Sequence, residues 1–422
     1  MRERPGFSPH TLHGDDAHQY FRVTMMCAIA CANQARYRPS RAAESLAYYS
    51  DAVTCVEEVT SEVSPASLQA LLLLIVFCLF YPRKGDIWKL LDYACRLTVE
   101  LGYHTEQEQE SEPSNIESLD DFQDQRRKKL RRSTFWGLYA IERIVGQLFG
   151  RGTDLPETII TTEYPSALAE SSTVDQVSLQ PMSIAHHYRL VYLRSELFRT
   201  MYLPASSPDL GLDWLRDKHA ALYAWRNELA VSDELTGVAT ITCDVGYDAT
   251  ICFLFQPMML KALRTTQGSI PEQGTSPQSA SDATSKCFVA ADSFWSSCNL
   301  IRTYEKLIRA PEDSVLGTYP MTFMSAHYIW IASSTLLAHT LLAIDGRTKV
   351  VPRDGVDIDN RWDPDASNES IDYGVFIDIS GSCLILLSWC VERWPGMAGM
   401  LDVYKRLFKR LTRELIRKGL VS

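Results

Sequence analysis

The segment "DDFQDQRRKKLRRSTFWGLYAIERIVGQLFGR", residues 120–151, joins a strongly charged stretch to an apolar one. Leu138, Ile141, Val145 and Leu148 recur at spacings of three and four, which predicts a helix with one buried face. Six of the seven residues 126–132 are basic. At about 100° per residue their side chains would point in every direction around the helix. We therefore predict one helix of about 30 residues and roughly 45 Å, exposed at its start, buried at its end and stopped by Gly150 or Gly152.

Helical periods also dominate the rest of the chain, so we predict an all-α fold with an irregular arrangement of many helices. Ser64 and Pro65 are typical of a helix start, and Asp86 and Gly102 are typical of the start and the end of the next helix. We predict further helices at 184–202, 212–229, 247–263, 287–308, 321–344, 375–393 and 400–418. Three polar segments, 105–117, 265–286 and 345–372, are predicted to be loops within a single domain that spans residues 1–422.

The composition limits the classes of partner. The formal net charge of −10 makes non-specific binding to a phosphate backbone unfavourable, so we expect this chain to contact DNA only indirectly. The eleven cysteines are scattered singly, which indicates packing in a reducing compartment. The segment 321–344 is long enough to span a membrane, but its histidine and hydroxyl residues favour a core helix, and no membrane partner is expected.

The basic residues of the opening segment are the candidate site. Short basic runs are typical of nuclear-import signals and docking surfaces, although a solvated helix face is the simpler alternative. The candidate residues are Arg126, Arg127, Lys128, Lys129, Arg131 and Arg132. Asp120, Asp121 and Asp124 form the D-D-x-x-D pattern of class I terpene cyclases, which are also all-α. That enzyme alternative needs a second magnesium-binding cluster of the N/D-D-x-x-S/T-x-x-x-E kind, which the sequence lacks, and the neighbouring cations would compete with magnesium.

Other candidate groups favour structural roles. Phosphate loops, nucleophile elbows and metalloprotease motifs are missing, so we predict no catalytic, cofactor-binding or metal-ligating residues. His186 and His187 point to different sides of a helix, and His327 and His339 are expected to be hydrogen-bonded core histidines. Consecutive residues diverge on a helix, so Glu142 and Arg143 are each expected to pair with another helix.

Two segments, "WKLLDYACRLTVELGYH" (88–104) and "RRKKLRRSTFWGLYAIERIVGQLFGRGTDLPETIITTEYP" (126–165), together resemble a known family. They resemble the middle homology region of fungal zinc-cluster transcription factors. The matching positions are Trp88, Ala94, Leu101, Gly102, Tyr103, His104, Arg131, Arg132, Phe135, Trp136, Glu142, Arg143, Gly150, Arg151, Ile159, Ile160 and Pro165. Gly152 departs from the pattern, in which proline is usual. The resemblance covers 68–165 well and continues more weakly through 222–229, 247–260 and 393–411.

The resemblance implies an all-α regulatory domain in a nuclear transcription regulator, with expected control of a metabolic or secondary-metabolite gene set. Expected partners are other transcription proteins, a second copy of the chain and a small-molecule effector. The family's six-cysteine DNA-binding cluster is missing from the 422 residues. We therefore expect either a stand-alone regulatory domain or a sequence that lacks that module. A protein-interaction scaffold is the remaining alternative.

Overall fold

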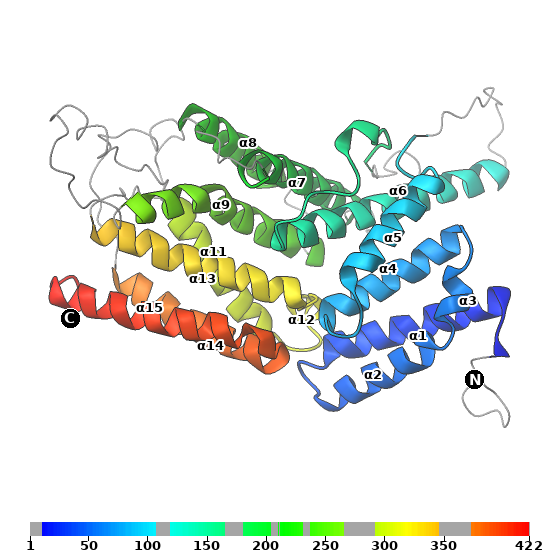
Figure 1. The fold of residues 1–422 in the computed structure, drawn as a ribbon, viewed down its shortest axis with the longest axis horizontal. Coiled ribbons are helices and arrows are strands. Elements are labelled where there is room, and N and C mark those ends of the chain that lie inside the picture. The colour runs from blue at the N-terminus through cyan, green and yellow to red at the C-terminus, as the bar shows by residue number, and fades with distance from the viewer. Residues whose placement is uncertain are drawn as a thin grey trace. The chain divides into compact units, whose positions relative to one another are not determined.

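The computed structural model describes residues 11–106, 119–164, 180–203, 210, 212–230, 237–265, 292–345 and 373–421. These residues form α-helices and short 3-10 turns, with no strand among them (Figure 1). The all-α prediction is therefore confirmed. The three predicted loops lie outside the described residues except for Thr105, Glu106, Thr265 and Asp345.

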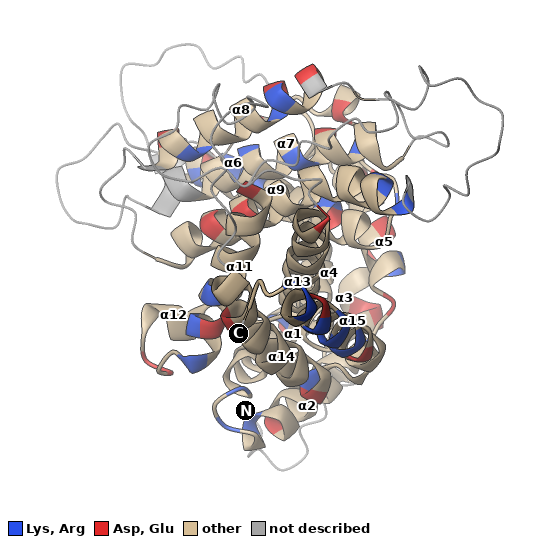
Figure 2. Cartoon of the chain, turned by 90° about the vertical axis from the view of Figure 1, so that its left-hand side faces the viewer, with Lys and Arg blue, Asp and Glu red and all other residues tan. Residues whose placement is uncertain are grey.

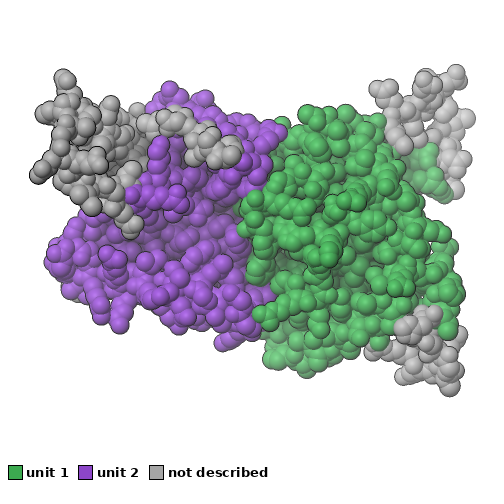
Figure 3. All heavy atoms as spheres, viewed as in Figure 1, with its two compact units in different colours: residues 1–195, 311–324 green, residues 196–310, 325–422 purple. Residues whose placement is uncertain are grey.

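The chain divides into two compact units (Figure 3). Unit 1 comprises residues 1–195 and 311–324, and unit 2 comprises residues 196–310 and 325–422. The chain passes from one unit to the other at three places: within helix α7 (Gln180–Met201), between Ala310 and Pro311, and within helix α13 (Phe323–Ile344). The expectation that residues 1–422 act as a single regulatory domain stays a prediction.

Unit 1 is built around its first helices, which bury a common apolar core. Besides most of α7, unit 1 contains α1 (Gly14–Gln34), α2 (Ser40–Val53), α3 (Val56–Thr60), α4 (Pro65–Phe80), α5 (Ile87–Glu100), α6 (Leu119–Leu148), the 3-10 turn η2 (Glu157–Ile159) and α12 (Val315–Thr318). Helix α1 packs against α2, α3 and α4. Phe21, Met25 and Phe77 are fully buried in this core, and the Phe77 ring stacks on Tyr49 with 4.2 Å between the ring centroids.

The caps of α4 and α5 explain where these helices begin and end. The Ser64 hydroxyl accepts a hydrogen bond from the Ser67 N–H at 3.1 Å, and Pro65 occupies the first turn of α4. The Asp86 carboxylate accepts from the N–H groups of Trp88 and Lys89 at the start of α5. After α5, Gly102 takes a φ of +67°, which only glycine adopts at little cost. Both predicted starts and the predicted stop are confirmed.

Unit 2 contains the remaining helices. They are α8 (Leu212–Ala230), α9 (Val238–Thr265), α11 (Asp292–Arg309), α14 (Tyr373–Arg393), the 3-10 turn η4 (Pro395–Met397) and α15 (Ala398–Arg417), with the end of α7 and most of α13. Helix α11 packs against α9 and α14, α8 packs against α9, and α15 packs against α14. Phe255, Phe294 and Phe376 are fully buried here.

The predicted helix boundaries agree with the structure to within a few residues, except at the start of α9. That helix begins at Val238, nine residues before the predicted start. Its first turns contain several β-branched residues, whose helix propensity is weak, but tertiary packing overrides propensity. Cys243 and Val245 are buried there, and Asp244 pairs with Arg226 of α8. Residues 287–291 of the next predicted helix lie outside the described residues.

Three helices, α9, α13 and α14, are long and apolar enough to cross a membrane by length and composition. The sequence indicated such a length and composition only for the segment 321–344, which contains α13. In the most apolar windows of α9 and α13, 61% and 67% of the residues are buried inside the fold, compared with 39% in α14. Packing within unit 2 therefore accounts for most of the apolar surface of α9 and α13, as expected for core helices.

Candidate regulatory surface on helix α6

Helix α6 is one uninterrupted helix of 30 residues, as predicted. Side chains from Gln123 to Leu130 are exposed, so this stretch of the helix extends into solvent. We call Arg126, Arg127, Lys128 and Lys129 the basic turn. Two of its cations have ion pairs: Arg127 lies 3.4 Å from Asp124, and Lys128 lies 3.1 Å from Glu106. The expected exposure is therefore confirmed for these four residues.

Arg131 and Arg132, the inner arginine pair, do not share this exposure. Arg131 donates hydrogen bonds to the carbonyl oxygens of Gly102 and Thr105, and its guanidinium lies over the Tyr103 ring. The Arg132 side chain is only 11% exposed. The expectation of full exposure is wrong for these two residues, because the turn after α5 packs along this part of α6 and supplies the oxygen atoms that bind them.

Arg132 joins two acidic residues from separate segments. Its guanidinium donates to both carboxylate oxygens of Glu106, at 3.1 and 2.7 Å, and to Glu163 at 2.5 Å. Partial burial by itself would raise the pKa of Glu106, but hydrogen bonds from Arg132, the Glu163 N–H and Lys128 lower this pKa to about 2. The Glu106 carboxylate is therefore ionised across the physiological range and links the turn after α5 to α6.

A segment that follows α6 returns along the helix and covers its middle. This return segment, residues 157–164, is tied to the end of the α5 turn by hydrogen bonds from the N–H groups of Thr161 and Thr162 to the His104 carbonyl. The Trp136 indole N–H donates to the Glu163 carbonyl at 2.8 Å, and its ring stacks on Tyr164 with centroids 4.3 Å apart. The return segment begins with η2, and none of its residues forms a strand.

Glu142 and Arg143 are both buried and pair with each other. Arg143 also donates to the Thr153 hydroxyl, the Leu155 carbonyl and, at 3.0 Å, Glu157. Burial by itself lowers the pKa of Arg143, but the charges of Glu142 and Glu157 reverse this effect and raise it. The expectation that each of them pairs with another helix is wrong. They pair with each other, and the further partners of Arg143 come from the segment directly after α6.

The end of α6 is closed by aromatic and cationic contacts to α5. Gly150 has a φ of +69° and lets the chain turn, so that the Arg151 N–H bonds to the Gly146 carbonyl. The Arg151 guanidinium then lies over the Trp88 ring at 5.1 Å, and Phe149 meets the same ring edge-on. Phe149 is nevertheless 54% exposed, so the prediction that the helix is buried at its end is wrong for this residue. Trp88 of the first motif segment and Arg151 of the second are thus in contact in unit 1.

Comparison with known proteins identifies this arrangement. The model of the fungal specific transcription factor domain matches residues 3–227, which is more than half of the chain. The chain belongs to the fungal transcription factor domain family. The positions that match the family pattern in the sequence, from Trp88 to Pro165, all lie within the matched range. No solved structure matches the chain.

Several curated fungal regulators are similar to this fungal transcription factor domain. It is 27% identical over 177 residues to the pyrimidine pathway regulatory protein 1 of Saccharomyces cerevisiae, which covers 38% of the chain and 18% of that protein. It is 26% identical over 247 residues to the positive regulator of purine utilization of Emericella nidulans, covering 44% of the chain and 23% of that protein. A negative regulator of pleiotropic drug resistance from Candida glabrata is 26% identical over 160 residues, 37% of the chain and 15% of that protein. The chain thus spans only about a fifth of the length of these relatives.

The acidic partners of α6 were not identified from the sequence of the fungal transcription factor domain. Glu106 belonged to a polar segment that was predicted to be a loop, and Glu157 and Glu163 follow α6 without any distinctive spacing. Their roles depend on contacts across 26 and 31 residues to Arg132 and across 14 residues to Arg143. Arg132 and Arg143 of the motif were the available signal: a buried charge requires a partner, so acidic residues had to lie near them.

The remaining candidate groups of the domain lie elsewhere. Asp120 and Asp121 belong to α6, but their side chains are outside the described residues, and Asp124 pairs with Arg127. In the described part of the chain, no cluster of His, Cys, Asp and Glu has a geometry suited to a metal ion. The magnesium alternative therefore has no support in the described residues.

His339 lies fully buried in α13, as expected for a core histidine. Neither ring nitrogen has a hydrogen-bond partner among the described residues, so the expected hydrogen bond is not found there. The lack of solvation lowers its pKa to about 4, and the ring is neutral at physiological pH. Phe294 lies beside this ring with centroids 5.4 Å apart. The neutral His339 ring thus packs in the core like an aromatic side chain.

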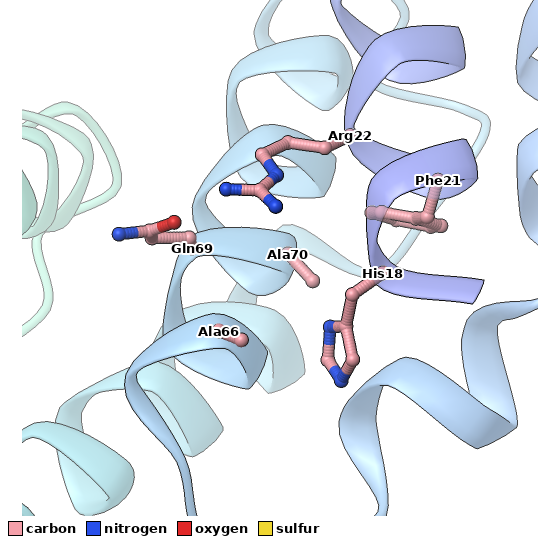
Figure 4. Close-up of a pocket in the computed structure, with 6 residues that line it drawn as sticks. All are labelled: His18, Phe21, Arg22, Ala66, Gln69 and Ala70. Carbon is pink, nitrogen blue, oxygen red and sulfur yellow. The ribbon is translucent and has the colours of Figure 1, made fainter. Parts of the chain in front are cut away.

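A small cavity lies between α1 and α4 in unit 1 (Figure 4). His18, Phe21 and Arg22 line it from α1, and Ala66, Gln69 and Ala70 line it from α4. Its empty volume of about 200 Å³ includes open solvent, whereas pockets for small ligands usually enclose about 300–1,000 Å³. This cavity is therefore too small to be assigned to a metabolite effector.

Proposed function

We propose that this domain is the regulatory part of a nuclear transcription regulator, and that the basic turn of α6 is its import or docking element. Family membership and the three regulatory relatives support the class of function. The observation that carries the site is the contrast within α6. Four consecutive cations are exposed and have at most one described carboxylate partner each, whereas Arg131 and Arg132 are partly buried and each held by at least two oxygen atoms of the same unit.

This contrast separates a structural role from a recognition role. The inner arginine pair, Trp136 and Arg143 fix the direction of α6 through two neighbouring segments, the turn after α5 and the return segment. The basic turn then extends from this fixed base into solvent, where a receptor or partner with acidic side chains can reach it. A rigid base reduces the conformational entropy that binding would otherwise cost. We also propose that the regulator controls a metabolic gene set and that a small molecule regulates it.

The test compares two sets of substitutions in a fluorescent fusion expressed in a fungus. Arg126→Gln, Arg127→Gln and Lys129→Gln together should leave the melting temperature unchanged and reduce the nuclear-to-cytoplasmic ratio several-fold. The matched control is Gln123→Ala, an exposed and uncharged position in the same half of α6. If the triple variant folds and keeps both its localisation and its binding partners, the basic turn is only a solvated face and the proposed site is wrong.

A further inference from the structure

Helix α15 in unit 2 presents a second basic surface, which the proposed function does not use. Its inner face is anchored by Leu401, Tyr404, Leu411 and Leu415, all buried, and it packs against α14. Phe408 contacts Phe376 of α14 with ring centroids 6.0 Å apart. The orientation of α15 about its own axis is therefore fixed, and so is the set of side chains that it presents outward.

The outward face is strongly cationic (Figure 2). Residues 402–418 contain seven basic and two acidic side chains, a net charge of +5 in a chain whose total is −10. Four exposed cations follow the helix at spacings of three and four, so they line one face. We call this set the basic stripe; it consists of Arg406, Lys409, Arg410 and Arg413.

The basic stripe forms no ion pair within the described part of the chain, although the charge of Arg410 helps to lower the pKa of Glu414. None of its four side chains lies within ion-pair distance of a described carboxylate, and Arg406 donates only to the Asp402 carbonyl at 3.3 Å. In contrast, Arg417 pairs with Glu414, and Lys418 donates to the Ile344 carbonyl at the end of α13. The helix therefore contains structural cations and unpaired cations side by side.

An apolar edge runs beside the basic stripe. Val403 and Leu407 are one turn apart, and their side chains are 36% and 45% exposed. Exposed apolar residues are common singly, but here two neighbouring ones border a row of unpaired charges. A partner that complements this surface needs negative charges on one side and apolar side chains on the other.

We propose that the outer face of α15 binds an acidic amphipathic segment of a partner protein. Its carboxylates would pair with the basic stripe, and its apolar residues would cover Val403 and Leu407. A phosphate backbone would use only the charges, and the net charge of −10 opposes its approach. A membrane would need a wide apolar face, but the apolar face of α15 is already buried against unit 2.

The test measures fluorescence anisotropy of a labelled 20-residue peptide with Asp and Glu on one helical face and Leu and Phe on the other. The purified 422-residue chain should bind it, and the variant Arg406→Gln, Lys409→Gln, Arg410→Gln and Arg413→Gln should bind about tenfold more weakly, about 1.4 kcal/mol. Leu407→Ala should weaken binding severalfold, and a scrambled peptide of equal composition should also bind more weakly. Arg417→Gln is the matched control, because its cation is already paired, and should change the affinity by less than about twofold.

Four outcomes would overturn the proposal. The first is unchanged peptide affinity in a stripe variant whose circular dichroism spectrum and melting temperature match those of the parent. The second is equal affinity for the helical peptide, the scrambled peptide and a 20-base-pair DNA duplex, which would show only non-selective attraction to anions. The third is binding to vesicles containing phosphatidylserine that depends on Leu407. The fourth is a dimer of the chain that the stripe substitutions abolish, which would assign this face to self-association.

Discussion

Arg131 and Arg132 differ from the four basic residues before them because their side chains are partly buried and each is held by more than one oxygen atom of the same unit. Arg131 binds carbonyl groups at the end of α5, and Arg132 forms charge-assisted hydrogen bonds to Glu106 and Glu163. Such bonds in a partly buried site contribute more than exposed ion pairs, which contribute about 0–1 kcal/mol. At the scale of single residues, the basic run therefore contains two structural residues, Arg131 and Arg132, and the four exposed residues of the basic turn.

The low pKa of Glu106 makes a pH-dependent contribution to stability. Its folded-state pKa of about 2 lies below the ordinary value of 4.5, so the folded state favours the ionised form. This stabilisation is fully present above pH 4.5 and is lost as the pH falls toward 2. The pKa difference corresponds to a contribution of at most about 3 kcal/mol to the free energy of unfolding.

Glu106→Gln should therefore destabilise the protein at pH 7 and reduce the loss of stability between pH 4.5 and pH 2. The measurement is chemical denaturation across this pH range. Asp124→Asn, which changes an exposed partner of Arg127, serves as the control and should have little effect. Parallel curves for parent and Glu106→Gln would show that Glu106 does not provide this pH dependence.

The buried pair of Glu142 and Arg143 makes a second prediction at this scale. Arg143→Met would leave the Glu142 carboxylate buried without its cation, which should cost about 3–5 kcal/mol. The double variant Glu142→Gln, Arg143→Met removes that uncompensated charge and should recover part of the loss. Urea denaturation of both variants measures the coupling. A single variant within about 0.5 kcal/mol of the parent would contradict the assignment.

At the scale of elements, α6 combines two environments in one continuous helix. Its second half buries Phe135, Trp136, Leu138 and Tyr139, and the return segment covers Trp136. Its first half has no such cover. A stabilising contact and a recognition surface thus occupy different turns of the same element, which is why substitutions in the two halves should have different effects.

Trp136→Ala should destabilise unit 1 by about 3–5 kcal/mol, because it removes a large buried ring and its hydrogen bond. Trp136→Phe retains an aromatic ring without the N–H donor, and its loss should be smaller. The thermal unfolding of both variants, compared with that of the basic-turn triple variant, measures this difference. Equal melting temperatures for Trp136→Ala and the parent would be incompatible with the buried position of the ring.

Most elements could be predicted from the sequence because their signals are local. Ser64, Asp86 and Gly102 act on backbone groups within a few residues, and the spacing of apolar residues in α6 indicates its buried face. The partners of Arg132 could not be predicted in this way, because Glu106 and Glu163 lie in polar segments 26 and 31 residues away. The start of α9 was missed because packing outweighs the weak propensity of its first turns.

At the scale of the whole molecule, the chain forms two compact units that local sequence signals did not reveal. Residues 311–324 belong to unit 1, although they lie between two parts of unit 2 in the sequence. Arg36 and Asn33 of α1 hold this segment by hydrogen bonds to the carbonyl groups of Gly317 and Thr318. Such long-range contacts have no counterpart in hydrophobic periodicity. Family membership, in contrast, was accessible from the motifs between Trp88 and Ile160.

The central claim is that this domain regulates transcription and requires the basic turn of α6. The most direct measurement attaches the chain to a bacterial DNA-binding module with a strong separate import signal and records a reporter gene in a fungus. The account predicts that reporter output differs from that of the module alone, and that the triple substitution of Arg126, Arg127 and Lys129 reduces this difference if the basic turn docks a partner. If the basic turn serves import alone, the added signal should restore full regulation to the triple variant. Output equal to that of the module alone, with the fusion folded and present in the nucleus, would contradict the claim.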